Sequence, residues 1–244
     1  MKKTILITGA SGKLGRALVE STLLKKYTLL TPPHSELDIT NKEAVEAYCT
    51  KNTFDIVIHL AALANVKLSE EKPLDAITTT YLGTLNLIEA ISSRKPVHFI
   101  YLSTDYVYPC IKGPYIETDE LAPFTIYGWT KLAAEQLVKT VPNHCIIRTS
   151  FFDPVKITYE KAPQDAYVSK ITFQEGAEAI AQLIEIKYTG ILNVGQKRIS
   201  LYDLYKQYNP KILPISIKDI PKEQQRAVDS SLDVSVWERI KGDT

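Results

Sequence analysis

A tyrosine and a lysine four residues apart form the first pair of side chains that could do chemistry. Tyr127 and Lys131 lie near the start of a segment, 125–141, whose apolar residues recur with helical spacing. Residues four apart share one face of a helix, so the charge of Lys131 is expected to lower the pKa of the Tyr127 phenol from its usual value of about 10. Such a pair suits proton transfer. The alternatives are a half-buried core phenol and a solvated helix lysine.

Glycines at a spacing of three form a second candidate site, in the segment Thr8-Gly9-Ala10-Ser11-Gly12-Lys13-Leu14-Gly15. A short apolar run leads into it and a helical pattern leaves it, which is the context that a dinucleotide-binding turn requires. Glycine permits the tight turn and the close approach of a pyrophosphate, and helix N–H groups then face the anion. The alternative is a plain glycine turn, but the flanking strand and helix favour a cofactor. The cofactor-binding residues expected in this turn are Gly9, Ser11, Gly12, Lys13, Leu14 and Gly15.

Strand and helix patterns alternate over the first 150 residues. Short apolar runs typical of buried strands are each followed by a segment with helical periodicity. The expected strands cover residues 4–8, 27–30, 54–60, 97–103 and 145–148, and the expected helices cover 14–24, 42–50, 74–91 and 125–141. Thr40 or Asn41 is expected to cap the second helix. This alternation predicts an α/β fold built on a doubly wound parallel sheet.

The rhythm weakens beyond Arg148. Residues 152–167 resemble a loop, 174–186 an amphipathic helix, 190–194 a strand, and 200–208 a short helix that Ser200 caps. No linker separates these segments from the rest. We therefore expect a sheet domain over residues 1–150 and a smaller part over residues 151–244, packed against it and partly interleaved with it.

The composition limits the classes of function. Of the 244 residues, 45% are apolar and 23% charged, which is typical of globular proteins. Twenty-nine basic against 28 acidic residues give a net charge of +1, so no strong field attracts nucleic acid or an anionic membrane. The three cysteines, Cys49, Cys110 and Cys145, lack zinc spacing, and no window reaches the roughly 18 apolar residues of a membrane span. We expect a cytoplasmic protein with reduced thiols and without a metal site.

The glycine spacing, taken with the Tyr127 and Lys131 pair, resembles the extended short-chain dehydrogenase/reductase superfamily. Further segments narrow the resemblance to the dTDP-4-dehydrorhamnose reductase family. They are Leu37-Asp38-Ile39-Thr40-Asn41, His59-Leu60-Ala61-Ala62, Ser103-Thr104-Asp105-Tyr106-Val107-Tyr108, the segment 113–119, and Arg148-Thr149-Ser150. The resemblance is specific over residues 1–150 and thinner afterwards. It implies a Rossmann-type sheet with a small C-terminal substrate-binding part, and NAD(P)H-dependent reduction of a 4-keto-6-deoxy sugar nucleotide.

The resemblance also implies residue roles. The cofactor's pyrophosphate would lie along Gly12, Lys13 and Leu14. Asp38 and Ile39 would flank its adenine. Its central part would face Ala61, Ala62 and Leu63.

The resemblance gives the remaining residues roles in catalysis. Thr104 would donate a hydrogen bond to the substrate ketone, and Tyr127 would be the general acid. Lys131 would hold the nicotinamide ribose. Asp105 and Phe151 would contact the sugar nucleotide.

Two departures from the family pattern bear on the site. Thr80 stands where extended members usually carry an asparagine that braces the active site. Members also have a helix before the Gln164 region, whereas only residues 154–163 span that interval here. We therefore expect a more open substrate cleft. A second copy could cover it, which makes a homodimer one assembly compatible with the sequence.

The residues that follow the second strand indicate whether the cofactor carries a 2′-phosphate. NAD-selective folds place an acidic residue there on the ribose hydroxyls, and no acid follows Leu30 until Glu36. Lys13, His34 and Ser35 could instead hold a 2′-phosphate. This pattern favours NADP(H) over NAD(H).

Two other functions remain open. One is a nucleotide-sugar epimerase or dehydratase on the same fold, but related dehydratases carry Thr-Asp-Glu where this chain has Tyr106 in the third place, which argues against elimination. The other is a non-catalytic dinucleotide-binding regulatory subunit. The shortened 154–163 segment favours it, and the presence of Thr104, Tyr127 and Lys131 disfavours it.

Overall fold

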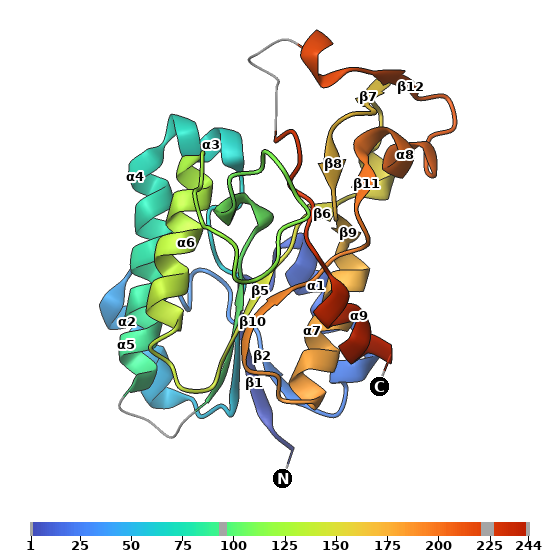
Figure 1. The fold of residues 1–244 in the computed structure, drawn as a ribbon. Coiled ribbons are helices and arrows are strands. Elements are labelled where there is room, and N and C mark those ends of the chain that lie inside the picture. Colours follow the sequence, from blue (N-terminus) through green and yellow to red (C-terminus); the bar gives the residue numbers. More distant parts are fainter. Residues whose placement is uncertain (1, 93–96, 221–226, 243–244) are drawn as a thin grey trace.

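The fold is organised by one six-stranded sheet in which every neighbouring pair of strands is parallel (Figure 1). A computed structural model describes residues 2–92, 97–220 and 227–242. The sheet contains β1 (Thr4–Thr8), β2 (Thr28–Leu30), β3 (Ile56–His59), β4 (His98–Leu102), β5 (His144–Arg148) and β10 (Gly190–Asn193). Their order is β10-β5-β4-β3-β1-β2. The predicted α/β fold with a doubly wound parallel sheet is confirmed.

Helices cover both faces of this sheet (Figure 1). One face packs against α1 (Lys13–Glu20), α7 (Phe173–Glu185) and α9 (Ser235–Gly242), and the other against α2 (Lys42–Lys51), α5 (Gly83–Ser92) and α6 (Ile126–Val138). Successive strand residues point to opposite faces. Ile5 and Ile7 therefore join the first core, whereas Leu6 joins the second. This double burial explains why the strands are continuous apolar runs rather than alternating ones.

The helical pattern over 74–91 is interrupted in the structure. α4 (Pro73–Ala76) continues through a π-helical turn, η2 (Ile77–Leu82), into α5. π-helical turns inside helices often occur at functional sites, and this one carries Thr80. The preceding short helix, α3 (Val66–Glu71), was not predicted, because its polar sequence has no apolar stripe.

Short helical turns complete the connections. They are η1 (Thr22–Leu24), η3 (Asp105–Val107), η4 (Pro154–Lys156) and η5 (Ile217–Asp219). Two predicted caps are present: Asn41 accepts a hydrogen bond from Ala44 N at 2.9 Å, and Ser200 accepts one from Asp203 N at 3.0 Å.

Residues 152–167, which the sequence predicted to be a loop, contain short strands whose partners lie further along the chain. Three pairs of short strands form there: β6 (Phe151–Phe152) with β9 (Ile171–Thr172), β7 (Lys161–Pro163) with β12 (Leu213–Ile215), and β8 (Tyr167–Val168) with β11 (Ile199–Ser200). Each pair joins segments distant in the chain, which local patterns cannot reveal. With α8 (Leu201–Lys206), the pairs β7–β12 and β8–β11 form a small lobe beside the carboxyl ends of the main sheet (Figure 1). Residues after 150 also return to the main sheet as α7 and β10.

Candidate active site

The residues predicted to do chemistry meet at the carboxyl edge of the main sheet. The glycine turn follows β1, residues 61–63 follow β3, Thr104 follows β4, and Phe151 comes shortly after β5. The strand order reverses at β1, because β2 lies on one side of it and β3 on the other. Open parallel sheets bind ligands at the carboxyl ends of their strands next to such a reversal.

Glycine is required in the turn after β1 by two close approaches. Gly9 has a φ of +72°, and a Cβ there would lie 2.8 Å from Ala61 N. A Cβ on Gly15 would lie 2.5 Å from Ala10 Cα, so α1 could not pack so closely on the turn. The third glycine, Gly12, precedes α1, and no side chain caps this helix end. The first N–H groups of α1 are thus free of side-chain caps where a phosphate group would approach.

The side chains of Ser11, Lys13 and Leu14 in the glycine turn lie in three different environments. Lys13 Nζ forms an ion pair with Asp153 Oδ2 at 2.9 Å and lies 5.3 Å from the ring centre of Phe173. Leu14 is buried in the core, and Ser11 is exposed. Leu14 can therefore face a cofactor only through its backbone, whereas Lys13 connects the turn to the C-terminal part.

His59, the last residue of β3, is buried beneath this site. Its Nδ1 lies 2.6 Å from Thr8 Oγ1 and its Nε2 lies 3.0 Å from Thr84 Oγ1. Thr84 donates its own proton to the Thr80 carbonyl at 2.6 Å, so it accepts a proton from Nε2, and Nδ1 accepts the proton of Thr8. Burial, followed by the charge of Lys131, lowers the pKa of His59 to about 3. The ring is therefore neutral and fixed in one tautomer.

The loop after β3 is attached to this network. Ala61 N donates to Thr8 Oγ1 and Leu63 N donates to Thr80 Oγ1, both at 3.3 Å. Thr80, which replaces the asparagine expected by resemblance, thus braces the loop expected to face the cofactor. The sequence did not predict the roles of His59 and Thr84; a histidine that ends a buried strand is the one signal pointing to them.

Asp38 and Ile39 lie on the far side of the reversal point. Thr40 donates to Asp38 Oδ1 from its N at 2.9 Å and from its Oγ1 at 2.8 Å. Burial raises the pKa of Asp38, but these hydrogen bonds and the nearby His34 hold it below its ordinary value. Asp38 therefore shapes the turn, and Ile39 packs into the core.

Helix α6 brings Tyr127 and Lys131 to the same edge. Its first turn is fixed from two sides: Thr125 Oγ1 accepts from Gly128 N at 3.0 Å, and Glu70 of α3 accepts from Ile126 N at 2.7 Å. These bonds satisfy N–H groups that a helix start leaves without partners. Sequence reasoning missed Glu70, because α3 carries no helical signal.

The expected lowering of the Tyr127 pKa is wrong. Burial raises the pKa of Tyr127 to about 12, against a hydrogen bond with Thr104 that lowers it, and the charge of Asp105 raises it further. Burial also lowers the pKa of Lys131 to about 7, against the charge of Glu135. Loss of hydration therefore outweighs the hydrogen bond at Tyr127 and the neighbouring charge at Lys131. Lys131 is 3% exposed, and its Nζ lies 4.1 Å from the centre of the Tyr101 ring.

A buried ion pair lies behind Lys131. Arg148 and Glu135 are both fully buried and share two hydrogen bonds, from Nε at 3.0 Å and from Nη2 at 2.8 Å. Ser103 also donates to Glu135, and Arg148 Nη1 donates to the Tyr108 hydroxyl at 2.8 Å. No local pattern predicts this pair, since Glu135 belongs to α6 and Arg148 to β5.

A cleft of about 1110 Å³ is lined by Tyr106 and Thr125, which come soon after Thr104 and just before Tyr127 in the chain. Aromatic residues from two segments line it: Tyr106 and Phe124, whose ring centres are 5.2 Å apart, and Phe151 and Phe152 of β6. Phe151 stacks on Phe173 at 5.1 Å. The lining combines apolar and aromatic residues with charged ones, as binding sites for small ligands do. Asp105 is 1% exposed and does not line the cleft.

Residues 1–154 match the family model described as the RmlD substrate binding domain. The chain belongs to this family. The dTDP-4-dehydrorhamnose reductase of Mycolicibacterium smegmatis is 36% identical over 154 residues, which cover 62% of this chain and 46% of that protein. The chain spans about half the length of the curated relatives it matches.

Solved structures of relatives extend the RmlD family likeness over the whole chain. A dTDP-4-dehydrorhamnose reductase from Clostridium acetobutylicum superimposes with a TM-score of 0.89 at 27% identity, covering 98% of this chain and 93% of that one. One from Bacillus anthracis, in complex with NADP, has a TM-score of 0.85 at 27% identity, covering 99% and 92%. The C-terminal part, where the sequence resemblance is thin, therefore shares the family's architecture.

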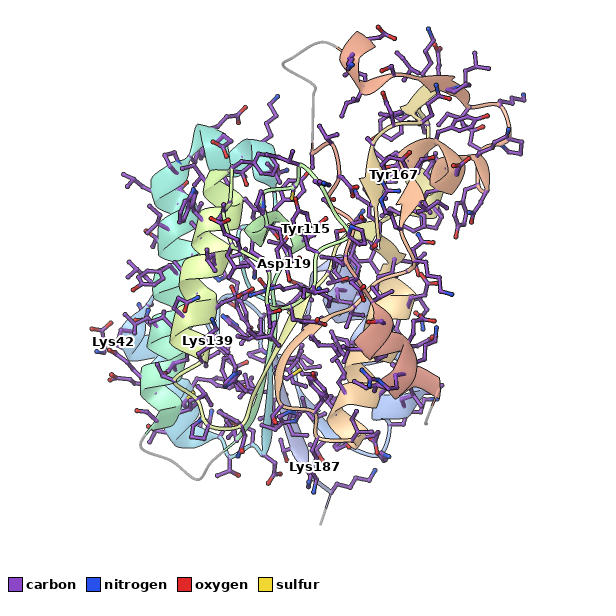
Figure 2. All side chains as sticks on the ribbon, in the orientation of Figure 1. Lys42, Tyr115, Asp119, Lys139, Tyr167 and Lys187 are labelled. Atoms are coloured by element: carbon purple, nitrogen blue, oxygen red, sulfur yellow. The ribbon has the colours of Figure 1, made fainter. Side chains whose placement is uncertain are left out.

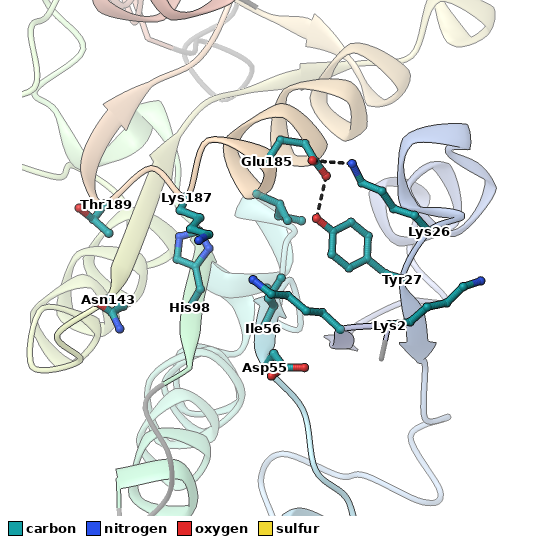
Figure 3. A pocket seen from close by; sticks show the side chains of 12 residues that line it. Lys2, Lys26, Tyr27, Asp55, Ile56, His98, Asn143, Glu185, Lys187 and Thr189 are labelled. Atoms are coloured by element: carbon teal, nitrogen blue, oxygen red, sulfur yellow. Dashed lines mark hydrogen bonds and ion pairs between the residues drawn. The ribbon is translucent and has the colours of Figure 1, made fainter.

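A second hollow, of about 520 Å³, lies at the opposite, amino-terminal edge of the sheet (Figure 3). Figure 2 places Lys187 at this end of the molecule, far from the lobe that carries Tyr167. Glu185 accepts from Lys26 at 2.5 Å and from the Tyr27 hydroxyl at 2.7 Å (Figure 3). None of the predicted site residues lines this hollow, whereas Phe151 lines the cleft.

Residues 2–92, 97–220 and 227–242 contain no helix long and apolar enough to span a bilayer. Within the same ranges, no three or more histidine, cysteine, aspartate or glutamate side chains are grouped so that they could hold a metal ion.

Proposed function

We propose that this chain is an NAD(P)H-dependent reductase of a 4-keto-6-deoxy sugar nucleotide. The observation that carries the proposal is that Thr104, Tyr127 and Lys131 lie together at the carboxyl edge of the sheet, where Tyr127 is hydrogen-bonded to Thr104 and shares helix α6 with Lys131. The names of the relatives from Mycolicibacterium smegmatis and Bacillus anthracis support the substrate class. In this proposal residues 1–150 hold the cofactor, and residues 151–244 add the smaller substrate-binding part.

The nicotinamide cofactor would supply the hydride, and its fit is supported by the start of α1 after Gly12, where no side chain caps the helix. The backbone of Gly12, Lys13 and Leu14 would face the pyrophosphate. Asp38 and Ile39 would lie beside the adenine.

The loop after β3 and α6 would hold the reacting end of the cofactor. Ala61, Ala62 and Leu63 would face its central part. Lys131 would hold the nicotinamide ribose. The hydrogen bond from Leu63 N to Thr80 would hold the loop that contains residues 61–63 in place.

The protein's own chemistry is proton transfer to the carbonyl oxygen. Tyr127 would donate the proton, and Thr104 would stabilise the negative charge that develops there. With a pKa of about 12, Tyr127 holds its proton at neutral pH and is ready as an acid. Phe151 would contact the sugar nucleotide, whereas Asp105, which is 1% exposed, would reach it only through its hydrogen bond with Thr104.

We further propose that NADP(H) is preferred over NAD(H). The relative from Bacillus anthracis is in complex with NADP. His34 and Ser35 are exposed beyond the end of β2, where a 2′-phosphate would lie. Lys13 would add its charge there only by leaving Asp153, since the two now form an ion pair.

A steady-state assay tests the function. Oxidation of NADPH and NADH is followed with a panel of 4-keto-6-deoxy sugar nucleotides, and binding of each cofactor is measured by calorimetry. We expect turnover, and loss of cofactor binding in Gly12→Val, where a side chain would enter the pyrophosphate's space. Cofactor binding without turnover on any substrate would favour the regulatory-subunit alternative.

The short 154–163 segment gives the proposal a second test. Between residues 154 and 163 the structure has η4 and β7 and no longer helix, so we expect weak binding of the sugar nucleotide by the monomer. Covering by a second copy would make activity depend on protein concentration. Tight binding by a dilute monomer, verified by light scattering, would show that the short segment suffices.

A further inference from the structure

The Thr104 hydroxyl has its single proton directed away from the cleft. Thr104 Oγ1 accepts a hydrogen bond from Tyr106 N at 3.2 Å and donates to Asp105 Oδ1 at 3.0 Å. A hydroxyl has one proton and two lone pairs. While the proton is donated to Asp105, only a lone pair of Thr104 faces a substrate carbonyl. Two oxygen lone pairs repel, so this arrangement opposes the reaction proposed above.

Asp105 lies in an unusual place for an ionised carboxylate. It is 1% exposed, and within the described residues its Oδ2 has no hydrogen-bond partner. Burial raises its pKa, against the lowering effects of Lys170 and of the hydroxyls of Ser230, Ser150 and Thr104. A buried charge with one oxygen unpaired is costly, whereas the neutral acid is much less so.

We propose that Asp105 is a positioning residue that works as the neutral acid and turns the Thr104 hydroxyl toward the substrate. The proton comes from solvent and resides on Oδ1. In the hydrogen bond between the two side chains, Asp105 is then the donor and Thr104 the acceptor. Thr104 then accepts from Asp105 and from Tyr106 N, and its own proton points to the carbonyl oxygen. Tyr127 donates to the same carbonyl oxygen. Both lone pairs and the proton of Thr104 Oγ1 then take part in hydrogen bonds. The inference rests on the proposed function, because it needs a carbonyl in the cleft.

Three titratable groups face Asp105 from the surrounding elements. The charge of Lys170, just before β9, favours the ionised form of Asp105. Ionised Asp105 in turn raises the pKa of Tyr127 on α6 and of the Cys110 thiol. Of these three groups, Lys170 is the one whose removal should favour the neutral acid.

The first test compares two substitutions of Asp105 by their profiles of kcat against pH. Asp105→Asn keeps a donor for Thr104, so we expect kcat within a few-fold of the unmodified protein and no loss of activity as pH rises through the titration of Asp105. Asp105→Ala removes the donor and should lower kcat by roughly ten- to a hundred-fold at all pH values. Asp119→Asn, in the same loop, is the matched control. An Asp105→Asn protein as inactive as Asp105→Ala would overturn the proposal.

The second test uses Lys170. Lys170→Met should raise the pKa of Asp105 and move the alkaline loss of kcat to higher pH. Lys67→Met, which removes another lysine from the same cleft, should leave the profile in place. A shift to lower pH in Lys170→Met, or equal shifts in both variants, would contradict the proposal.

A third measurement does not depend on turnover. The Asp105 carboxyl carbon is titrated by carbon NMR in the protein loaded with NADPH, and Asp105→Asn identifies its signal. A neutral carboxyl at neutral pH supports the proposal, and an ionised one overturns it. If no 4-keto sugar nucleotide is reduced, the proposed function fails, while this titration still decides the state of Asp105.

Discussion

The two edges of the main sheet are both hollowed and both lined by charged side chains, yet they differ in kind. At the amino-terminal edge, Lys26 and Glu185 form an ion pair with side chains 60% and 36% exposed. At the carboxyl edge, burial changes the chemistry, lowering the pKa of Lys131 to about 7 and raising that of Tyr127 to about 12. Burial also raises the pKa of Tyr27 to about 12 at the amino-terminal edge, so the edges differ in their lysines. Lys131 has lost its water and its pKa is lowered, whereas Lys26 is exposed and paired with a carboxylate. The comparison teaches that a buried lysine next to a buried tyrosine, rather than a hollow with charged walls, distinguishes the candidate site.

The largest expected effect is loss of the acid at the carboxyl edge. Tyr127→Phe keeps the ring but removes the proton, and it should lower kcat by roughly 10²- to 10⁴-fold. Cofactor affinity, measured by calorimetry, should change little. A turnover within two-fold of that of the unmodified protein would show that Tyr127 is not the general acid. The carboxyl edge would then not differ from the amino-terminal edge in having a catalytic tyrosine.

The buried ion pair behind the site should dominate stability. Arg148→Met leaves Glu135 buried without its partner and should lower the free energy of unfolding by about 3–5 kcal/mol. The double variant Arg148→Met, Glu135→Met removes both charges and should recover much of that loss. Urea denaturation measures all three proteins. A double variant no more stable than Arg148→Met would show that the uncompensated charge is not the cause.

The acid sensitivity of the fold should depend on His59. Its pKa is about 3 in the folded chain and about 6.5 when unfolded, so the unfolded state binds more protons between these values. Stability is thus lost as pH falls, by about 2 kcal/mol between about pH 6.5 and about pH 5. His59→Gln should flatten this part of the curve of unfolding free energy against pH. An unchanged slope would mean that other groups cause it.

The smallest effect belongs to the amino-terminal edge. Lys26→Met removes an exposed ion pair and should change the free energy of unfolding by less than about 1 kcal/mol, an effect that salt weakens further. Activity should not change. A loss comparable to that of Arg148→Met would show that the two edges are not as different as their exposure indicates.

Local sequence patterns predicted the elements whose structure depends only on residues close together in the chain. The glycine turn, the caps Asn41 and Ser200, and the strands around Ile5 and Ile58 follow from spacing and side-chain type. The pairing of β6 with β9 could not be predicted, because each strand has two residues and its partner lies beyond a loop.

In the candidate site, too, the sequence predicted the features that depend on nearby residues and missed those that depend on contacts across the fold. The sequence placed Tyr127 and Lys131 on one helix, and α6 confirms that placement. It gave the wrong direction for the tyrosine's pKa, because the direction depends on how deeply β4 and its neighbours bury the pair. Glu70, His59 and Glu135 act through contacts across the fold, and no local pattern identifies them.

The place of β10 has a consequence for how the chain must be made. A protein ending at residue 154, where the family match stops, would lack β10 and α7. β5 would then be an edge strand with unpaired N–H and C=O groups, and Leu18 of α1 would lose its cover. Such edges recruit other chains, so a truncated product should aggregate. During synthesis the same edge stays open until residue 193 has left the ribosome, so the nascent chain is vulnerable for as long as β10 is missing.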